Sequence, residues 1–206
     1  MTSAPESQEA RGSYDERTAL VVVDVQNDFA HPDGNLYVQG GDASIAAVNR
    51  EIEAAQRAGA LIVYTQDWHP PVTPHFQKDG GTWPTHCVQD TWGAELHPAL
   101  KVVEGAPVVR KGTGGEDGYS GFSVRDPESG AEAPTELEGI LKERNVTRVV
   151  VVGLAQDVCV KETVLDARRL DFDTSVIGDA TRPVDLQPGD GDRALSEMTG
   201  AGAALR

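Results

Sequence analysis

The sequence contains few cysteines and no long apolar segment. Its two cysteines, Cys87 and Cys159, are too few to form a disulfide framework in a chain of 206 residues, so free thiols are expected. No apolar run approaches the ~20 residues that a membrane-spanning helix needs. The N-terminal residues lack a cationic start followed by an apolar stretch, which is the pattern of a secretory signal. By elimination we expect a cytoplasmic protein with no membrane partner.

Positive charge is also scarce, because 18 Lys and Arg residues stand against 33 Asp and Glu residues. The formal net charge is −15 and the pI is about 4.6. Repulsion between this charge and other polyanions argues against nucleic acid and anionic membranes as partners. The hydrophobic content of 39% suits a globular protein. A small neutral molecule is a compatible substrate.

The order of apolar patterns predicts the fold. Residues 1–16 are polar and predict a disordered lead-in, and residues 17–206 predict a single domain. Buried strands are predicted from short runs rich in β-branched residues at 18–25, 60–65, 107–110, 149–152 and 172–177. Apolar residues at helical spacing predict helices from Asp42 or Ser44 to about 58, and at 134–144, 157–170 and 191–199. This alternation predicts an α/β fold, a three-layer α/β/α sandwich around a mostly parallel, Rossmann-like sheet.

Reactive side chains follow the predicted strands. Asp24, the segment 67–69, Lys111 and Cys159 each lie at or just beyond a strand's carboxyl end, the edge at which such sheets bind ligands. An aspartate base with a lysine partner can activate a cysteine nucleophile. Cys159 also lies in the first turn of a predicted helix, where unpaired N–H groups favour a thiolate. Taken singly, each residue has a more ordinary explanation: a turn aspartate, a surface lysine, an inert thiol. Their coincidence at three strand ends favours catalysis.

A second group of residues has the composition of a metal site. Three of the five histidines, His69, His75 and His86, lie within eighteen residues of one another. Asp67 and His69 can face the same side of an extended segment, because side chains alternate with a period of two. A carboxylate with imidazoles suits a divalent ion such as Zn, Fe or Mn. Asp-x-His is by itself a weak signal. Cys87 is expected to pack rather than to bind, since cysteine ligands usually come in pairs.

Six segments together resemble a known family. They are VVDVQNDF (22–29), QDWHP (66–70), WPTHCV (83–88), RKG (110–112), YSGF (119–122) and VGLAQDVCV (152–160). In this order they resemble the nicotinamidases among the isochorismatase-like cysteine hydrolases, from about residue 18 to the C-terminus. The aspartate, lysine and cysteine are shared by the superfamily. The DWHP and WPTHC segments resemble the metal site that separates nicotinamidases from metal-free relatives.

The resemblance implies a role for each matching residue. Asp24 would accept a proton, Lys111 would be its partner and Cys159 would be the nucleophile. One divalent metal ion would be bound by Asp67, His69 and His86, with His75 as the additional ligand that some members use. The bond between Leu154 and Ala155 resembles the family's cis peptide bond near the oxyanion. Phe29, Trp83 and Tyr119 resemble the aromatic residues around a pyridine ring. The implied reaction converts nicotinamide to nicotinate and ammonia in NAD salvage, with pyrazinamide as a further substrate.

Alternatives remain at the level of substrate and role. The glycine-rich stretch 112–118 and Val158 vary among relatives and leave the shape of the pocket open. Another amidase of the superfamily, acting on a carbamoyl or ureido compound, would generally lack the metal ligands. A non-catalytic ligand-binding member would have a damaged Asp–Lys–Cys set, and a zinc-binding scaffold would not need the cysteine. A homo-oligomer is left open, because relatives differ in assembly.

Overall fold

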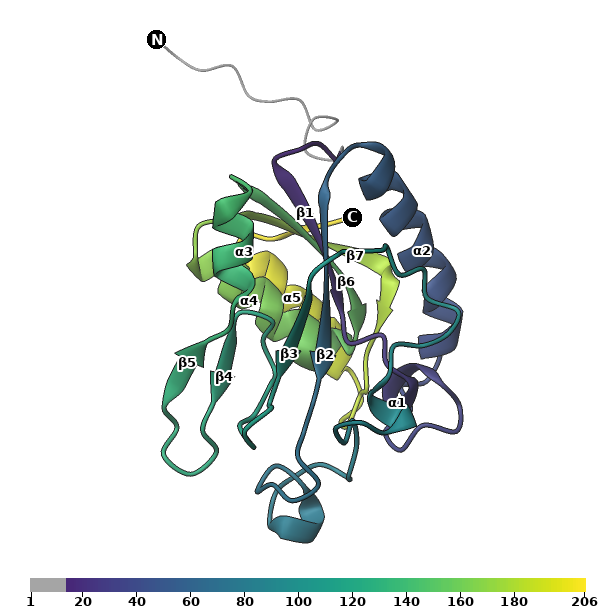
Figure 1. The fold of residues 1–206 in the computed structure, drawn as a ribbon, viewed down its shortest axis with the longest axis vertical. Helices are drawn as coiled ribbons and strands as arrows, with labels where there is room; N and C mark the ends of the chain where they lie inside the picture. The colour runs from purple at the N-terminus through teal and green to yellow at the C-terminus, as the bar shows by residue number, and fades with distance from the viewer. Residues whose placement is uncertain (1–13) are drawn as a thin grey trace.

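The centre of the molecule is a six-stranded sheet in which every neighbouring pair of strands is parallel (Figure 1). The structure is a computed structural model that describes residues 14–206. In the order β3-β2-β1-β6-β7-β8, the strands are Val108–Lys111, Leu61–Asp67, Thr18–Val23, Arg148–Leu154, Asp173–Arg182 and Ala204–Leu205. The predicted parallel α/β sheet is therefore confirmed.

Helices cover both faces of this sheet, so the predicted three layers are present. Helix α2 (Gly41–Arg57) lies on one face, and α3 (Leu137–Glu143), α4 (Lys161–Arg169) and α5 (Asp190–Gly200) lie on the other (Figure 1). Strand β1 shows why. Its alternate residues Leu20 and Val22 pack in the core with α2, while Val21 packs in the core with the other three helices. A run of apolar residues suits a strand that is buried on both faces.

Several short elements differ from the prediction. A two-stranded antiparallel hairpin, β4 (Ser123–Arg125) and β5 (Glu132–Pro134), precedes α3. Pro134 pairs with Ser123 in it, so the predicted helix from 134 begins only at Leu137. The remaining short elements are α1 (Asn27–Ala30), two 3₁₀ turns at Gln77–Asp79 and Trp92–Ala94, and a π turn at Gln156–Val160. Three-residue strands carry too little periodicity to be seen in a sequence.

The start of α2 also differs from the prediction. Neither Asp42 nor Ser44 is its N-cap: Gly40 is, with a φ of 77°. Asp42 lies in the first turn, and Ser44 donates a hydrogen bond to the Gly41 carbonyl at 2.7 Å. Of the predicted lead-in, residues 1–13 lie outside the described residues. In its last part the Tyr14 hydroxyl donates to Glu51 at 2.6 Å.

The carboxyl ends of the central strands meet at one edge of the sheet. In Figure 1 the arrowheads of β2 and β3 point to the bottom of the view, toward the loops that follow them. Asp24 directly follows β1, while Asp67 and Lys111 are the last residues of β2 and β3. Within residues 14–206 no helix has the length and apolar character needed to cross a membrane.

Candidate active site

Lys111 is the centre of the site. Its side chain is completely buried, and its ammonium donates to Asp24 Oδ2 at 2.6 Å and to Asp67 Oδ1 at 2.7 Å. It also donates to the carbonyl of Gly118 and lies 3.8 Å from the sulfur of Cys159. A buried ammonium is tolerated only where anions and acceptors surround it. The two carboxylates raise the pKa of Lys111 well above its usual value even though burial opposes this, so the lysine stays charged.

The two carboxyl groups on Lys111 have opposite pKa shifts. Burial raises the pKa of Asp24, and the negative charge of Asp67 adds to this rise. The other oxygen of Asp24 accepts a hydrogen bond from Thr65 Oγ1 at 2.6 Å. Asp67 is buried too, but the charge of Lys111 and contacts with His69 and His86 hold its pKa well below the usual range. Two acids whose pKa values are shifted in opposite directions can have different roles: Asp67 stays ionised, and Asp24 can carry a proton.

Cys159 lies beside these groups in the π turn that precedes α4. Its sulfur and one oxygen each of Asp24 and Asp67 lie within 4.8 Å of one another. The sequence predicted that N–H groups at the helix start favour a thiolate, but the net effect of its surroundings is the opposite. Burial raises the pKa of the Cys159 thiol well above its usual value, and the nearby Lys111 charge only partly opposes this. The resting side chain is therefore a thiol, which needs a base before it can attack.

The chain around Cys159 is shaped by a close approach of two strands. Gly153 has a φ of 110°, and a Cβ atom there would lie 2.0 Å from the Val23 carbonyl oxygen. Only glycine fits a position with both features. The peptide bond between Leu154 and Ala155, one residue further on, is cis. The Ala155 carbonyl then accepts hydrogen bonds from the backbone N–H groups of Val158 and Val160 at 3.1 and 3.0 Å.

Asp67 also faces the histidines with its second oxygen. Its Oδ2 atom lies 3.5 Å from His69 Nε2 and 3.6 Å from His86 Nε2. Gln26 holds the aspartate in place from β1's end: its amide donates to the Asp67 carbonyl at 2.7 Å and accepts from the Asp67 N–H at 2.9 Å. The carboxylate thus connects the Lys111 group to the histidine group. Gln26 lies within the quoted segment VVDVQNDF, but nothing in its local pattern shows that it reaches the next strand.

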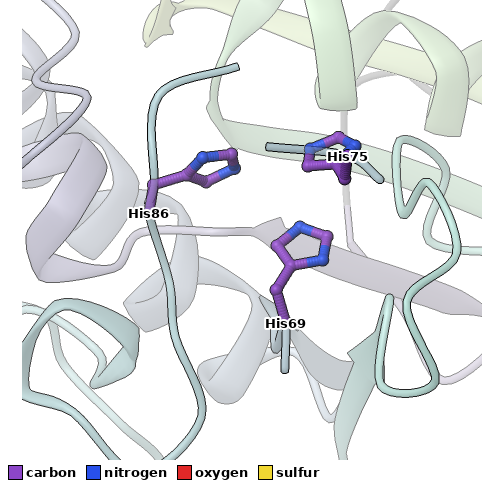
Figure 2. A group of neighbouring side chains, drawn as sticks. All are labelled: His69, His75 and His86. Carbon is purple, nitrogen blue, oxygen red and sulfur yellow. The ribbon is translucent and has the colours of Figure 1, made fainter. Parts of the chain in front are cut away.

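The rings of His69, His75 and His86 point toward one another from three separate segments, as Figure 2 shows. One nitrogen of each ring lies within 4.8 Å of the others, and all three residues are buried. Among the described residues neither nitrogen of His69 has a hydrogen-bond partner. Buried polar atoms are normally paired, and each exception needs an explanation. A divalent ion held by these nitrogens and Asp67 would supply one, and the nitrogen and oxygen donors fit such an ion.

An aromatic pocket opens beside both groups. It contains about 310 Å³ of space free of protein atoms, part of which is open to solvent. Its lining includes Asp67, His75, His86 and Cys159, the predicted aromatic residues Phe29, Trp83 and Tyr119, and the apolar Leu36, Val158 and Val184. Trp83 Nε1 donates to the Tyr119 hydroxyl at 2.9 Å. Leu36 and Val184 were missed, because lone apolar residues in loops carry no local signal.

The structure thus gathers the predicted site residues in one region. Cys87, which was expected to pack rather than to bind, is buried in the core, where its N–H donates to Asp28 Oδ2 at 2.7 Å. Residues 18–206 match the model of the isochorismatase domain. The chain belongs to the isochorismatase family.

Several named proteins resemble this chain over most of their length. The nicotinamidase of Escherichia coli is 40% identical over 204 residues, which cover 91% of this chain and 93% of the relative. A crystal structure of Pyrococcus horikoshii pyrazinamidase in complex with zinc has a TM-score of 0.82 at 40% identity and covers 92% of this chain and 98% of its own. The structure of PnC1 from L. infantum in complex with nicotinate has a TM-score of 0.84 at 34% identity, covering 94% of both chains.

Proposed function

We propose that this chain is a metal-dependent nicotinamidase that converts nicotinamide to nicotinate and ammonia through a thioester at Cys159. One observation carries the proposal: Lys111 binds the carboxylates of both Asp24 and Asp67. Lys111 therefore connects the pair formed by Cys159 and Asp24 to the nitrogen and oxygen donors of the candidate metal site, beside one pocket. Relatives named nicotinamidase and pyrazinamidase, at 40% identity, support the same substrate class.

The substrate ring would lie among Phe29, Trp83 and Tyr119, whose flat faces suit a pyridine. A divalent ion at Asp67, His69, His75 and His86 would supply a Lewis acid for the ring nitrogen. Zinc is the ion we propose first, because imidazole and carboxylate donors suit it and the Pyrococcus horikoshii structure is a complex with zinc. The ring's carboxamide would then face Cys159, which lines the same pocket.

Acylation begins with a proton transfer from Cys159 to Asp24, whose raised pKa makes it a stronger base for this proton than an ordinary aspartate. The sulfur attacks the carboxamide carbon, and the backbone N–H groups of Ala155 and Cys159 stabilise the oxyanion. Protonated Asp24 then gives its proton to the leaving nitrogen, and ammonia departs as the tetrahedral intermediate collapses to the thioester. In the second half, Asp24 accepts a proton from water, and the hydroxide releases nicotinate. The proton returns to the Cys159 sulfur.

The finer assignments belong to this proposal. Nicotinamide is the amide released when NAD is consumed, so the reaction would serve NAD salvage. Pyrazinamide differs from nicotinamide by one ring nitrogen and would be accepted as well. A cytoplasmic location and a homo-oligomeric assembly stay predictions.

An ammonia-release assay tests the substrate and the metal together. The purified chain should release ammonia from nicotinamide and not from ureido or carbamoyl compounds, and a chelator should stop the release. Turnover of a carbamoyl substrate that is faster than that of nicotinamide and insensitive to chelator would instead identify a metal-free type of amidase. Absence of ammonia from every amide would favour a ligand-binding protein.

A further inference from the structure

The histidines of the candidate metal site differ in what holds their second ring nitrogen. His86 Nδ1 lies 2.7 Å from the carbonyl oxygen of Pro84, and His75 Nδ1 lies 2.6 Å from Asp117 Oδ1. His69 has no such partner among the described residues. A carbonyl or carboxylate can only accept a hydrogen bond, so in both pairs the Nδ1 atom carries the proton. The Nε2 lone pair of each ring is then free for a ligand.

The contact of His75 with the Asp117 carboxylate needs more explanation than the contact of His86 with Pro84. A carbonyl two residues away, as at Pro84, follows from local chain geometry. Asp117 reaches His75 from 42 positions along the chain, in the glycine-rich stretch 112–118 that follows β3. A metal-bound histidine usually donates its other N–H to a carboxylate or carbonyl, which sets the tautomer, orients the ring and raises its basicity.

The backbone around Asp117 is tied down by the hairpin. Its N–H donates to the Arg125 carbonyl at 2.8 Å, and its carbonyl accepts from the Arg125 N–H at 3.0 Å. Thr73 makes a second link: its hydroxyl donates to the Gly115 carbonyl at 2.9 Å and accepts from the His75 N–H at 3.2 Å. The His75 segment and the glycine-rich stretch are therefore held together by backbone and side chain, which gives Asp117 a defined position.

The same stretch contacts the other ligands at its two ends. A Cβ atom on Gly112 would lie 2.6 Å from His69 Cε1, and one on Gly118 would lie 2.9 Å from Asp67 Oδ1. The stretch thus packs against His69 and Asp67 where it has no side chain, and reaches His75 with the Asp117 carboxylate. It lies against three of the four candidate ligands.

From these contacts we infer that Asp117 is a positioning residue of the metal centre, which holds His75 as a fourth ligand by accepting its Nδ1 proton. The inference rests on the proposed metal site and deepens it. It assigns a role to a stretch whose sequence suggested only a variable loop. The hairpin β4–β5 takes part as the support of Asp117.

The test measures zinc affinity by competition with a chromogenic chelator, on the purified chain and on variants whose folding is checked by circular dichroism. Asp117→Asn keeps the shape of the side chain and should weaken zinc binding by about 10–100-fold. His75→Ala should weaken it to a similar degree. In the double variant the loss should be no larger than in His75→Ala alone, because Asp117 acts through His75. Glu116→Gln is the matched control and should bind zinc normally. It removes the charge next to Asp117, on a side chain whose partner among the described residues is the Gly114 N–H, at 2.9 Å.

A second readout follows coordination directly. In the cobalt(II) form, the visible absorption of Asp117→Asn should shift toward that of His75→Ala, while Glu116→Gln should keep the original spectrum. Three results would overturn the inference: zinc affinity unchanged in Asp117→Asn, losses that multiply in the double variant, or a parent chain that binds no zinc. A parent chain that binds zinc but releases no ammonia from nicotinamide would contradict the proposed function alone, since the affinity comparison does not depend on turnover.

Discussion

The buried charge of Lys111 should contribute strongly to the stability of the fold. Lys111→Met removes the only ammonium that the described residues place on Asp24 and Asp67, and leaves two carboxyl groups buried without their partner. Breaking a buried pair in this way typically costs about 3–5 kcal/mol, so the free energy of unfolding by urea should fall by that amount. Lys101→Met is the control, because Lys101 is exposed and its Nζ atom lies 3.5 Å from Glu53 Oε1. Equal stabilities of the two variants would contradict the arrangement.

Cys159 carries the covalent step of the proposed mechanism. Cys159→Ala should fold normally and release no ammonia from nicotinamide, because no sulfur is left to form the thioester. Mass spectrometry of the acid-quenched parent chain during turnover should show a nicotinoyl group on Cys159. Cys87→Ala, which removes the other buried thiol, should keep the activity. Ammonia release by Cys159→Ala near the parent rate would rule out covalent catalysis.

The pKa of Asp24 predicts the acid side of the pH profile. Asp24 must be ionised to accept the cysteine proton, and burial raises its pKa. As the pH falls through that raised pKa the base becomes protonated, so kcat/KM should decline at a pH above the usual aspartate value of about 3.9. At higher pH Asp24 is ionised, so its titration should no longer change kcat/KM. Stopped assays across pH, with circular dichroism to confirm folding, measure it.

Asp24→Asn provides the matching check, because it cannot take up a proton. Its activity should be lower by about 10²–10⁴-fold, and what remains should not show the same acid limb. If the parent chain keeps full activity down to about pH 4, another group is the base.

At the scale of elements, the glycine-rich stretch after β3 packs against the candidate metal ligands. Gly112 has a φ of 73°, and its missing side chain leaves room for the His69 ring. In Gly112→Ala the added Cβ would meet His69 Cε1 at 2.6 Å, so the ring must move. Zinc affinity and nicotinamide turnover should both fall by at least about tenfold, as for other losses of ligand orientation.

Gly105→Ala separates this contact from backbone strain. Gly105 has a nearly equal φ of 75°, and a Cβ atom there would meet nothing within 4 Å. Both variants should lose about 1 kcal/mol of stability from the positive φ, and only Gly112→Ala should lose zinc affinity. Equal activities in the two variants would show that the His69 contact is unimportant.

At the scale of the whole molecule, metal binding should be visible as stability. A ligand that binds only the folded chain stabilises it, by about 2.7 kcal/mol when its concentration is a hundred times Kd. Adding a chelator should therefore lower the melting temperature of the parent chain. In His69→Ala the chelator should have little further effect and metal analysis should find less bound ion. His97→Ala, outside the donor set, should behave as the parent chain.

Much of the fold follows from local patterns, and some details do not. The long β-branched runs of β1 and β6 predict buried strands, because β-branched side chains favour strands over helices and parallel strands buried on both faces consist of such runs. Strand β7 extends to Arg182, beyond the predicted residue 177. Its pairing with β6 shifts in register between Val151 and Gly153 and then continues to Arg182. The hairpin β4–β5 was missed for a related reason: its three-residue strands are defined by their pairing and not by their composition.

The sequence by itself determined the parallel α/β fold and the places of the candidate reactive residues at strand ends, because these depend on neighbours along the chain. Only the tertiary structure decided how they meet. Lys111 reaches Asp24 across 87 positions and Asp67 across 44, since the strand order places β3, β2 and β1 side by side. Burial, which no local pattern measures, sets the high pKa of Cys159. The contact of Asp117 with His75 depends in turn on a hairpin that appears only after the chain has folded.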